Sequence, residues 1–113
     1  MSWIPLTSDA QVAEIIEKSR TGEKPIVVFK HSTRCGTSMF AKRRLQNSDA
    51  FRNNDFDIYY LDLLKYRSIS NHLAEAFGVE HQSPQILFIQ DGECVFHASH
   101  GAIDEGVFAK SSS

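Results

Sequence analysis

Apolar and polar residues alternate along the chain in a way that predicts eight elements. Short apolar or alternating runs between turn residues are typical of β-strands, and they cover residues 26–30, 57–63, 85–90 and 93–100. Segments with apolar residues three or four positions apart are typical of amphipathic helices. These begin near residues 8, 35, 68 and 103. The predicted order is therefore α-β-α-β-α-β-β-α.

Capping residues set the expected limits of the first and third helices. Ser8 matches the pattern of a helix start, and Gly22 is suited to end that helix. Ser68 or Ser70 is expected to cap the third helix, and Gly78 is expected to end it.

The second helix is expected to begin at Cys35 or Gly36. Its periodicity turns Phe40, Ala41 and Leu45 toward the core. The last helix, residues 103–110, is short, and the chain beyond it carries no structural pattern.

The connections between the strands predict the topology. The first two strands are joined by a helix, so they should run parallel with a right-handed crossover. The Asp91-Gly92 pair between the last two strands is a strong hairpin signal. We therefore expect one α/β domain over residues 1–113, with a core of about 7–110. A mixed four-stranded sheet flanked by helices is the thioredoxin-like architecture.

Composition narrows the class of protein. Apolar residues make up 42% of the chain, which is enough for one globular core. The net charge of −2 gives no overall basic field to attract nucleic acid. No apolar run is long enough to span a membrane, and no signal-peptide pattern is visible. With only two cysteines, the sequence favours a reducing cytoplasm over a disulfide scaffold.

Cys35 is the candidate reactive residue. It follows a buried strand and a polar loop, and it stands at the mouth of a helix. The free N–H groups and positive dipole end of that helix favour a thiolate and should lower the thiol pKa. Lys30, His31 and Arg34 add basic or ionisable groups nearby. The alternative is an inert structural cysteine, although its polar neighbours argue for exposure.

The neighbours of Cys35 each have a second interpretation. Gly36 supplies an N–H group at the helix start, and the Ser38 hydroxyl either points back to the sulfur or serves as an ordinary helix-start group. Lys30 either binds an anionic thiol or snorkels at the strand end. His31 either steadies the thiolate or lies in an exposed loop.

The second cysteine, Cys94, is not expected to pair with Cys35. The predicted strand order puts them at opposite ends of the sheet, and a disulfide requires Cα atoms within about 7 Å. Cys94 is therefore interpreted as a buried core residue. His97 and His100, three apart on a strand, should point to opposite faces. No metal site is therefore expected.

Three sequence strings resemble the YtxJ-type, bacilliredoxin-like monothiol proteins of the thioredoxin superfamily, which are found in bacteria that use bacillithiol. The strings are Phe29–Cys35, His81–Gln85 and His97–Gly101. The resemblance implies a cis peptide bond between Ser83 and Pro84, facing Cys35. That bond would leave the Ser83 backbone free to bind an extended substrate. The alternative is an ordinary turn proline.

The sequence departs from related patterns at two positions. Ser38 stands where a dithiol Cys-x-x-Cys motif has its second cysteine, and Gly36 stands where the family often has proline. Cys35-Gly36-Thr37-Ser38 also resembles the corresponding segment of monothiol glutaredoxins, which carry iron–sulfur clusters. Those proteins have a Gly-Gly-x-Asp segment that residues 99–104 do not match.

The resemblance therefore implies a cytoplasmic monothiol thiol–disulfide oxidoreductase that acts through Cys35. Its expected partners are S-thiolated cytosolic proteins and a low-molecular-weight thiol such as bacillithiol, with no tightly bound cofactor. Neither nucleic acid nor membrane is expected to bind. The alternatives are an iron–sulfur cluster-binding module and a non-catalytic thioredoxin-like scaffold.

Overall fold

The computed structural model describes residues 3–22, 24–32, 36–53, 56–99 and 103. At residues 37–38 and 49–50 it describes the backbone only. Cys35, Arg34 and the side chain of Ser38 therefore lie outside the described residues, as does the predicted last helix apart from Ile103.

Helices and strands in the described part of the chain keep the predicted order, but a strand at residues 4–5 and a short helix at residues 49–52 were not predicted. The four predicted strands match β2 to β5 to within one residue. The elements are β1 (Ile4–Pro5), α1 (Ala10–Thr21), β2 (Ile26–His31), α2 (Gly36–Gln46), α3 (Asp49–Arg52), β3 (Asp57–Asp62), α4 (Arg67–Phe77), β4 (Gln85–Gln90) and β5 (Glu93–Ser99).

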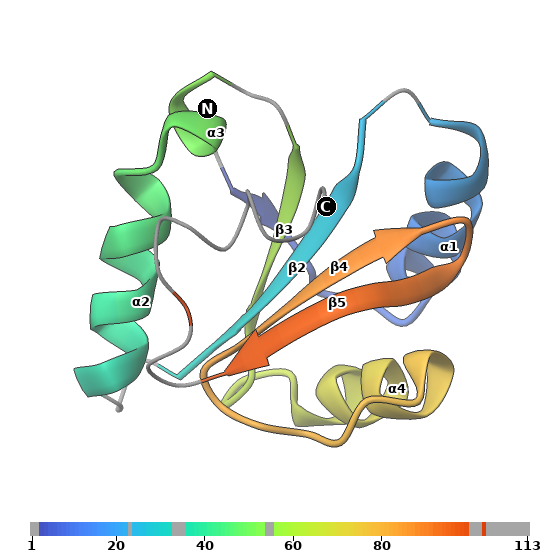
Figure 1. Ribbon diagram of the computed structural model, residues 1–113. Helices are drawn as coiled ribbons and strands as arrows, with labels where there is room; N and C mark the ends of the chain where they lie inside the picture. Colours follow the sequence, from blue (N-terminus) through green and yellow to red (C-terminus); the bar gives the residue numbers. More distant parts are fainter. Residues whose placement is uncertain (1–2, 23, 33–35, 54–55, 100–102, 104–113) are drawn as a thin grey trace.

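The sheet has five strands in the order β1-β3-β2-β4-β5, so the prediction of four strands was wrong by one (Figure 1). β2 runs parallel to β3 and antiparallel to β4, and β5 returns antiparallel to β4, as predicted. The extra strand, β1, adds to the edge by pairing Ile4 with Tyr59 of β3. A two-residue strand has no periodicity that a sequence pattern can show.

Two apolar cores lie on opposite faces of the sheet. Helices cover both faces (Figure 1). Val27 and Phe29 of β2 face the core beneath α2 and α3, whereas Ile26 and Val28 face the core beneath α1 and α4. All six residues of β2 are buried, as expected for a central strand covered on both faces.

The inner face of α2 was predicted only in part. Ala41 and Leu45 are buried, as expected, but the side chain of Phe40 is 65% exposed. Each helical residue is rotated by about 100° from the previous one. Phe40 therefore falls outside the stripe that Ala41 and Leu45, one turn apart, turn toward the sheet.

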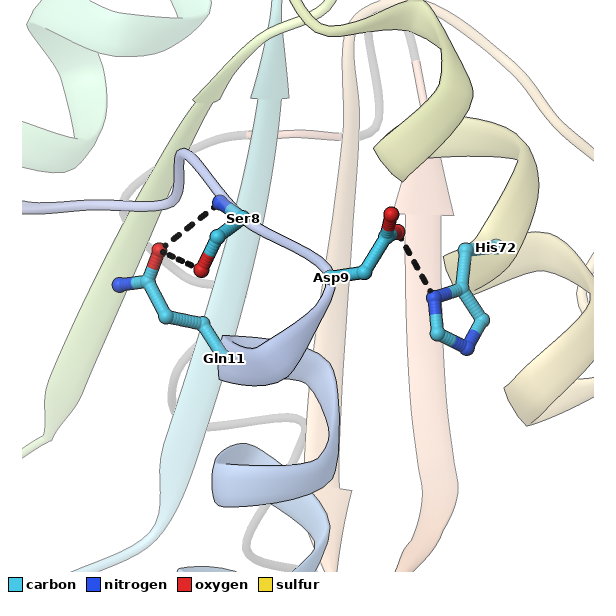
Figure 2. A network of polar contacts seen from close by, with 4 residues as sticks. All are labelled: Ser8, Asp9, Gln11 and His72. Carbon is cyan, nitrogen blue, oxygen red and sulfur yellow. Dashed lines mark hydrogen bonds and ion pairs between the residues drawn. The ribbon is translucent and has the colours of Figure 1, made fainter.

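The start of α1 uses its polar residues differently from the predicted cap. Asp9 is the N-cap, and its carboxylate lies 3.0 Å from Nδ1 of His72 in α4. Ser8 donates its backbone N–H to Oε1 of Gln11 at 3.1 Å (Figure 2). Ser8 thus contributes to the helix start without being its cap. Gly22 ends α1, as predicted, in an extended conformation.

The start of α4 also differs from the prediction. Tyr66 is the N-cap, so neither Ser68 nor Ser70 holds that position. Ser70 is instead buried inside the helix, where its hydroxyl lies 3.0 Å from Nδ1 of His81. Gly78 ends α4 in the left-handed conformation, with φ of 63°, as predicted.

The β4–β5 hairpin has the predicted Asp91-Gly92 turn. Both residues have positive φ, 53° and 78°, as a type I′ turn requires. The turn also packs on α1, because the N–H of Gly92 donates to Oγ of Ser19 at 2.8 Å. A Cβ added at Gly92 would lie 2.9 Å from Nε of Arg20.

Gly92→Ala should therefore lower the free energy of unfolding by about 1–2 kcal/mol, because a side chain strains positive φ and crowds Arg20. Gly36→Ala is the matched control, since a Cβ there meets no atom within 4 Å of the described structure. Chemical denaturation measures both variants. Equal stability of Gly92→Ala and the wild type would contradict the turn geometry.

Candidate functional site

The candidate site lies at the edge of the sheet where β2 ends and β4 begins. Lys30 of β2 pairs with Gln85, the first residue of β4. Pro84 therefore approaches this edge from one side, while the chain leaves β2 at His31 and enters α2 at Gly36. Cys35 is the residue that precedes Gly36 in the sequence. Gly36 itself is exposed.

The peptide bond between Ser83 and Pro84 is cis, the isomer that the family resemblance implies. Pro84 is buried, and the Ser83 side chain is half-buried. The Ser83 hydroxyl oxygen is buried and has no hydrogen-bond partner within the described structure. A buried hydroxyl without a hydrogen-bond partner is uncommon in folded proteins.

His31 is packed inside the protein, contrary to the alternative of an exposed loop histidine. Its side chain is only 1% exposed. The ring lies on the α2 side of β2, with centroid distances of 5.7 Å to Phe29 and 5.4 Å to Tyr60. The imidazole is thus held by neighbouring rings at the last residue of β2.

Lys30 points to the opposite face from His31, because successive strand residues alternate. Its side chain is 0% exposed, so it does not snorkel to solvent. The ammonium donates to the backbone oxygen of Ser70 at 3.5 Å. Burial lowers the pKa of Lys30 to about 8, although the Cys94 thiol acts in the opposite direction. The two expected basic neighbours of Cys35 on β2 are therefore separated by the sheet.

A cluster of polar residues beneath α4 was not predicted from the sequence. It joins Lys30 to Ser70, and Ser70 in turn to His81. Burial and the positive charges of Lys30 and Arg67 lower the pKa of His81. These residues come from a strand, a helix and a loop, so no local spacing could reveal the group.

Gln85 closes the loop that carries Ser83 and Pro84. Its side-chain amide donates to the backbone oxygen of Glu80 at 3.0 Å. Oε1 of Gln85 is buried without a hydrogen-bond partner among the described residues. Together with the contact of His81 to α4, this bond anchors the loop on the α4 side of the sheet.

Cys94 lies at the far end of the sheet, as the predicted strand order requires. It pairs with Ile89, and Ile89 pairs with Ile26, the first residue of β2. Its side chain is half-buried, less so than predicted. The thiol donates to the backbone oxygen of Phe96 at 3.4 Å, and burial raises its pKa.

The described residues hold no group of three or more His, Cys, Asp or Glu side chains that could bind a metal ion. His97 is exposed on β5, and His100 lies outside the described residues. Within the described helices, none is long and apolar enough to span a membrane.

Lys30→Met should stabilise the fold at pH 7 by roughly 3 kcal/mol, because the native state lowers the lysine pKa from 10.5 to about 8. Between pH 8 and pH 10.5, Lys30 is largely protonated in the unfolded chain but largely neutral in the native state. The stability of the wild type should therefore rise from pH 8 to 10.5, and the advantage of the variant should shrink.

Denaturant titrations across this pH range measure the effect. The control is Lys65→Met, since Lys65 is exposed and should leave the pH dependence of the wild type intact. A Lys30→Met variant less stable than the wild type at pH 7 would contradict this prediction. It would show that favourable interactions of the Lys30 ammonium outweigh the cost of burying its charge.

Comparison with known proteins identifies the family of this chain. The family model for the monothiol bacilliredoxin BrxC matches residues 4–107. A solved structure described as a candidate oxidoreductase with a thioredoxin fold is 30% identical, with a TM-score of 0.84, and the match covers 97% of this chain and 93% of the other.

More distant structures show the fold alone. Thioredoxin from Fasciola hepatica is 18% identical, with a TM-score of 0.72 and coverage of 96% of this chain and 94% of that one. Oxidised thioredoxin O2 from Arabidopsis thaliana is 21% identical, with a TM-score of 0.70 and coverage of 98% and 90%. Fold and family together support the function of a thiol–disulfide oxidoreductase. Because the family model spans residues 4–107, the chain belongs to the monothiol bacilliredoxin family.

Proposed function

We propose that the protein reduces mixed disulfides between proteins and a low-molecular-weight thiol, using Cys35 as its only exchanging thiol. The name of the family points to bacillithiol as that small thiol. The observation that carries the proposal is the place of Cys94. It pairs with Ile89 of β4, the partner of Ile26 at the start of β2, whereas Cys35 follows the end of β2 in the sequence. With Ser38 in place of a second motif cysteine, the chain offers no resolving thiol near Cys35.

The first step is attack of the Cys35 thiolate on the small-thiol sulfur of the mixed disulfide. A new disulfide forms between Cys35 and the small thiol, while the original S–S bond breaks. The leaving electron pair stays on the protein sulfur, which takes a proton from water and becomes a free thiol. No net oxidation occurs in this exchange.

The second step regenerates the enzyme. A second molecule of the low-molecular-weight thiol, as its thiolate, attacks the small-thiol sulfur of the Cys35 adduct. The products are the symmetrical small-molecule disulfide and the Cys35 thiolate. Each cycle therefore consumes one free small thiol, which leaves in a symmetrical disulfide with the small thiol that came from the substrate.

Three features of the described structure suit this chemistry. α2 begins at Gly36, and the N-terminal end of a helix favours a thiolate. α2 contains no acidic residue that would oppose it. The Ser83 backbone, beside the cis bond to Pro84, lies at the same end of the sheet, where it is proposed to bind the substrate backbone.

The other assigned residues act around the sulfur. Arg34 and Ser38 are proposed to stabilise the thiolate, and His31 provides a packed imidazole at the end of β2. Lys30 contributes its charge from the opposite face of the sheet. The substrates are S-thiolated proteins of a bacterial cytoplasm, where small thiols keep the protein reduced.

Cys35→Ser should abolish reduction of an S-bacillithiolated protein, because it removes the nucleophile. Cys94→Ala should retain the wild-type rate, since Cys94 lies at the far end of the sheet. Mass spectrometry follows the loss of the small thiol from the substrate and its appearance on the enzyme. A Cys35–Cys94 disulfide in the oxidised monomer would contradict the monothiol mechanism.

The Cys35 thiol should have a pKa below the free value of about 8.5, owing to the helix terminus and its basic neighbours. The rate of alkylation by iodoacetamide as a function of pH reports this value. The Cys94→Ala variant isolates the signal of Cys35. A midpoint at or above the free value would remove the electrostatic part of the proposal.

A further inference from the structure

The solvent side of α2 exposes large apolar side chains that have no role in the core. Met39 is 50% exposed and Phe40 is 65% exposed. Arg43 and Arg44 follow one turn later, and both are exposed. Residues three and four apart are neighbours on a helix surface. Gly36, Met39, Phe40, Arg43 and Arg44 therefore form one continuous strip, the α2 outer face (helix at the left of Figure 1).

This face is positively charged on a chain whose net charge is negative. α2 carries three successive basic residues and no Asp or Glu, whereas the whole chain has a net charge of −2. Lys42 is engaged within the fold, with its ammonium 4.9 Å from the ring centroid of Tyr60. Within the described structure, neither Arg43 nor Arg44 forms an ion pair. Their charges therefore remain open to an external anionic group.

The α2 outer face begins next to the proposed nucleophile. Gly36, its first residue, follows Cys35 in the sequence, and Arg44 lies about 12 Å further along the helix axis at ~1.5 Å per residue. A protein whose modified cysteine reacts with Cys35 brings its own surface to this end of the helix. The face is long enough to contact several residues beside the modified cysteine.

We propose that the α2 outer face is a docking surface for S-thiolated protein substrates that carry apolar and acidic side chains beside the modified cysteine. This inference rests on the proposed function and names the class of substrate for the same site. Phe40 and Met39 contact the apolar residues of the substrate, and the two arginines pair with its carboxylates. Complementarity of charge selects these proteins over basic ones.

Other occupants fit the face less well. Nucleic acid would use the two arginines but not the exposed Phe40 and Met39, and the net negative charge of the chain opposes it. Stable membrane binding requires a broad apolar face on a basic helix. Two adjacent apolar residues do not provide one.

The experiment compares two nine-residue peptides with a central cysteine in a mixed disulfide with bacillithiol. One peptide has Leu and Glu beside the cysteine, and the other has Leu and Lys. At low ionic strength kcat/KM should be about tenfold higher for the acidic peptide, as expected for a few exposed ion pairs. The difference should shrink in 0.5 M NaCl, because salt screens exposed charges, with a Debye length of roughly 3–8 Å at such concentrations.

Two sets of variants assign the preference to this face. Arg43→Gln/Arg44→Gln should remove the preference for the acidic peptide, whereas Arg20→Gln, which removes a basic residue on α1, should preserve it. Phe40→Ser should lower kcat/KM for the acidic peptide about tenfold relative to that for bacillithiol–N-acetylcysteine disulfide. Val95→Ser removes an exposed apolar residue on β5 and should not change this ratio.

Equal kcat/KM for the two peptides, or a preference that survives Arg43→Gln/Arg44→Gln, would overturn the docking surface and leave the reductase function standing. Failure of the wild type to reduce the small disulfide would instead overturn the proposed function. A homodimer lost on Phe40→Ser, seen by sedimentation, would assign the face to a second copy. Binding to phosphatidylglycerol vesicles lost on the same change would assign it to a membrane, and either result overturns the proposal.

Discussion

The structure depends on the burial of β2 between two strands and two helical layers. Its backbone pairs with β3 on one side and β4 on the other, and its side chains enter both cores. Because Lys30 pairs with Gln85, the antiparallel register brings the segment before β4 to the end of β2. At this same end of the sheet the chain leaves β2 at His31 and continues to α2. The candidate site is thus a consequence of one strand register.

The central position of β2 has an energetic cost, because it buries a charged side chain. Lys30 is fully buried, and burial disfavours its charged form. The apolar residues of β2 on both faces supply the burial that offsets this cost. The polar contacts beneath α4 then link β2 to the loop of Ser83 and Pro84 through Ser70 and His81. A costly internal charge at the candidate site is more readily explained by function than by stability.

The two faces of the sheet have different parts in the proposed mechanism. On one face, α2 provides a helix terminus for the thiolate and an exposed strip for the substrate. On the other face, α4 anchors the loop that presents Ser83, because His81 contacts Ser70 and Gln85 closes the loop on Glu80. In the proposed mechanism, the exchange reaction takes place at the end of β2, which both faces of the sheet share. The thiol and the substrate backbone would therefore be oriented by elements on opposite faces of the sheet.

The sequence by itself determined the strands β2 to β5, the Asp91-Gly92 turn and the end of the sheet at which the candidate site lies. These depend on short-range patterns, such as a run of apolar residues or a pair suited to positive φ. Only the tertiary structure decided that β1 joins the sheet, that Phe40 faces solvent and that Lys30 lies beneath α4. Periodicity shows that residues alternate or repeat, but the partner that covers each face comes from a distant segment. Lys30 and Ser70 are forty residues apart, and only the folded chain brings them together.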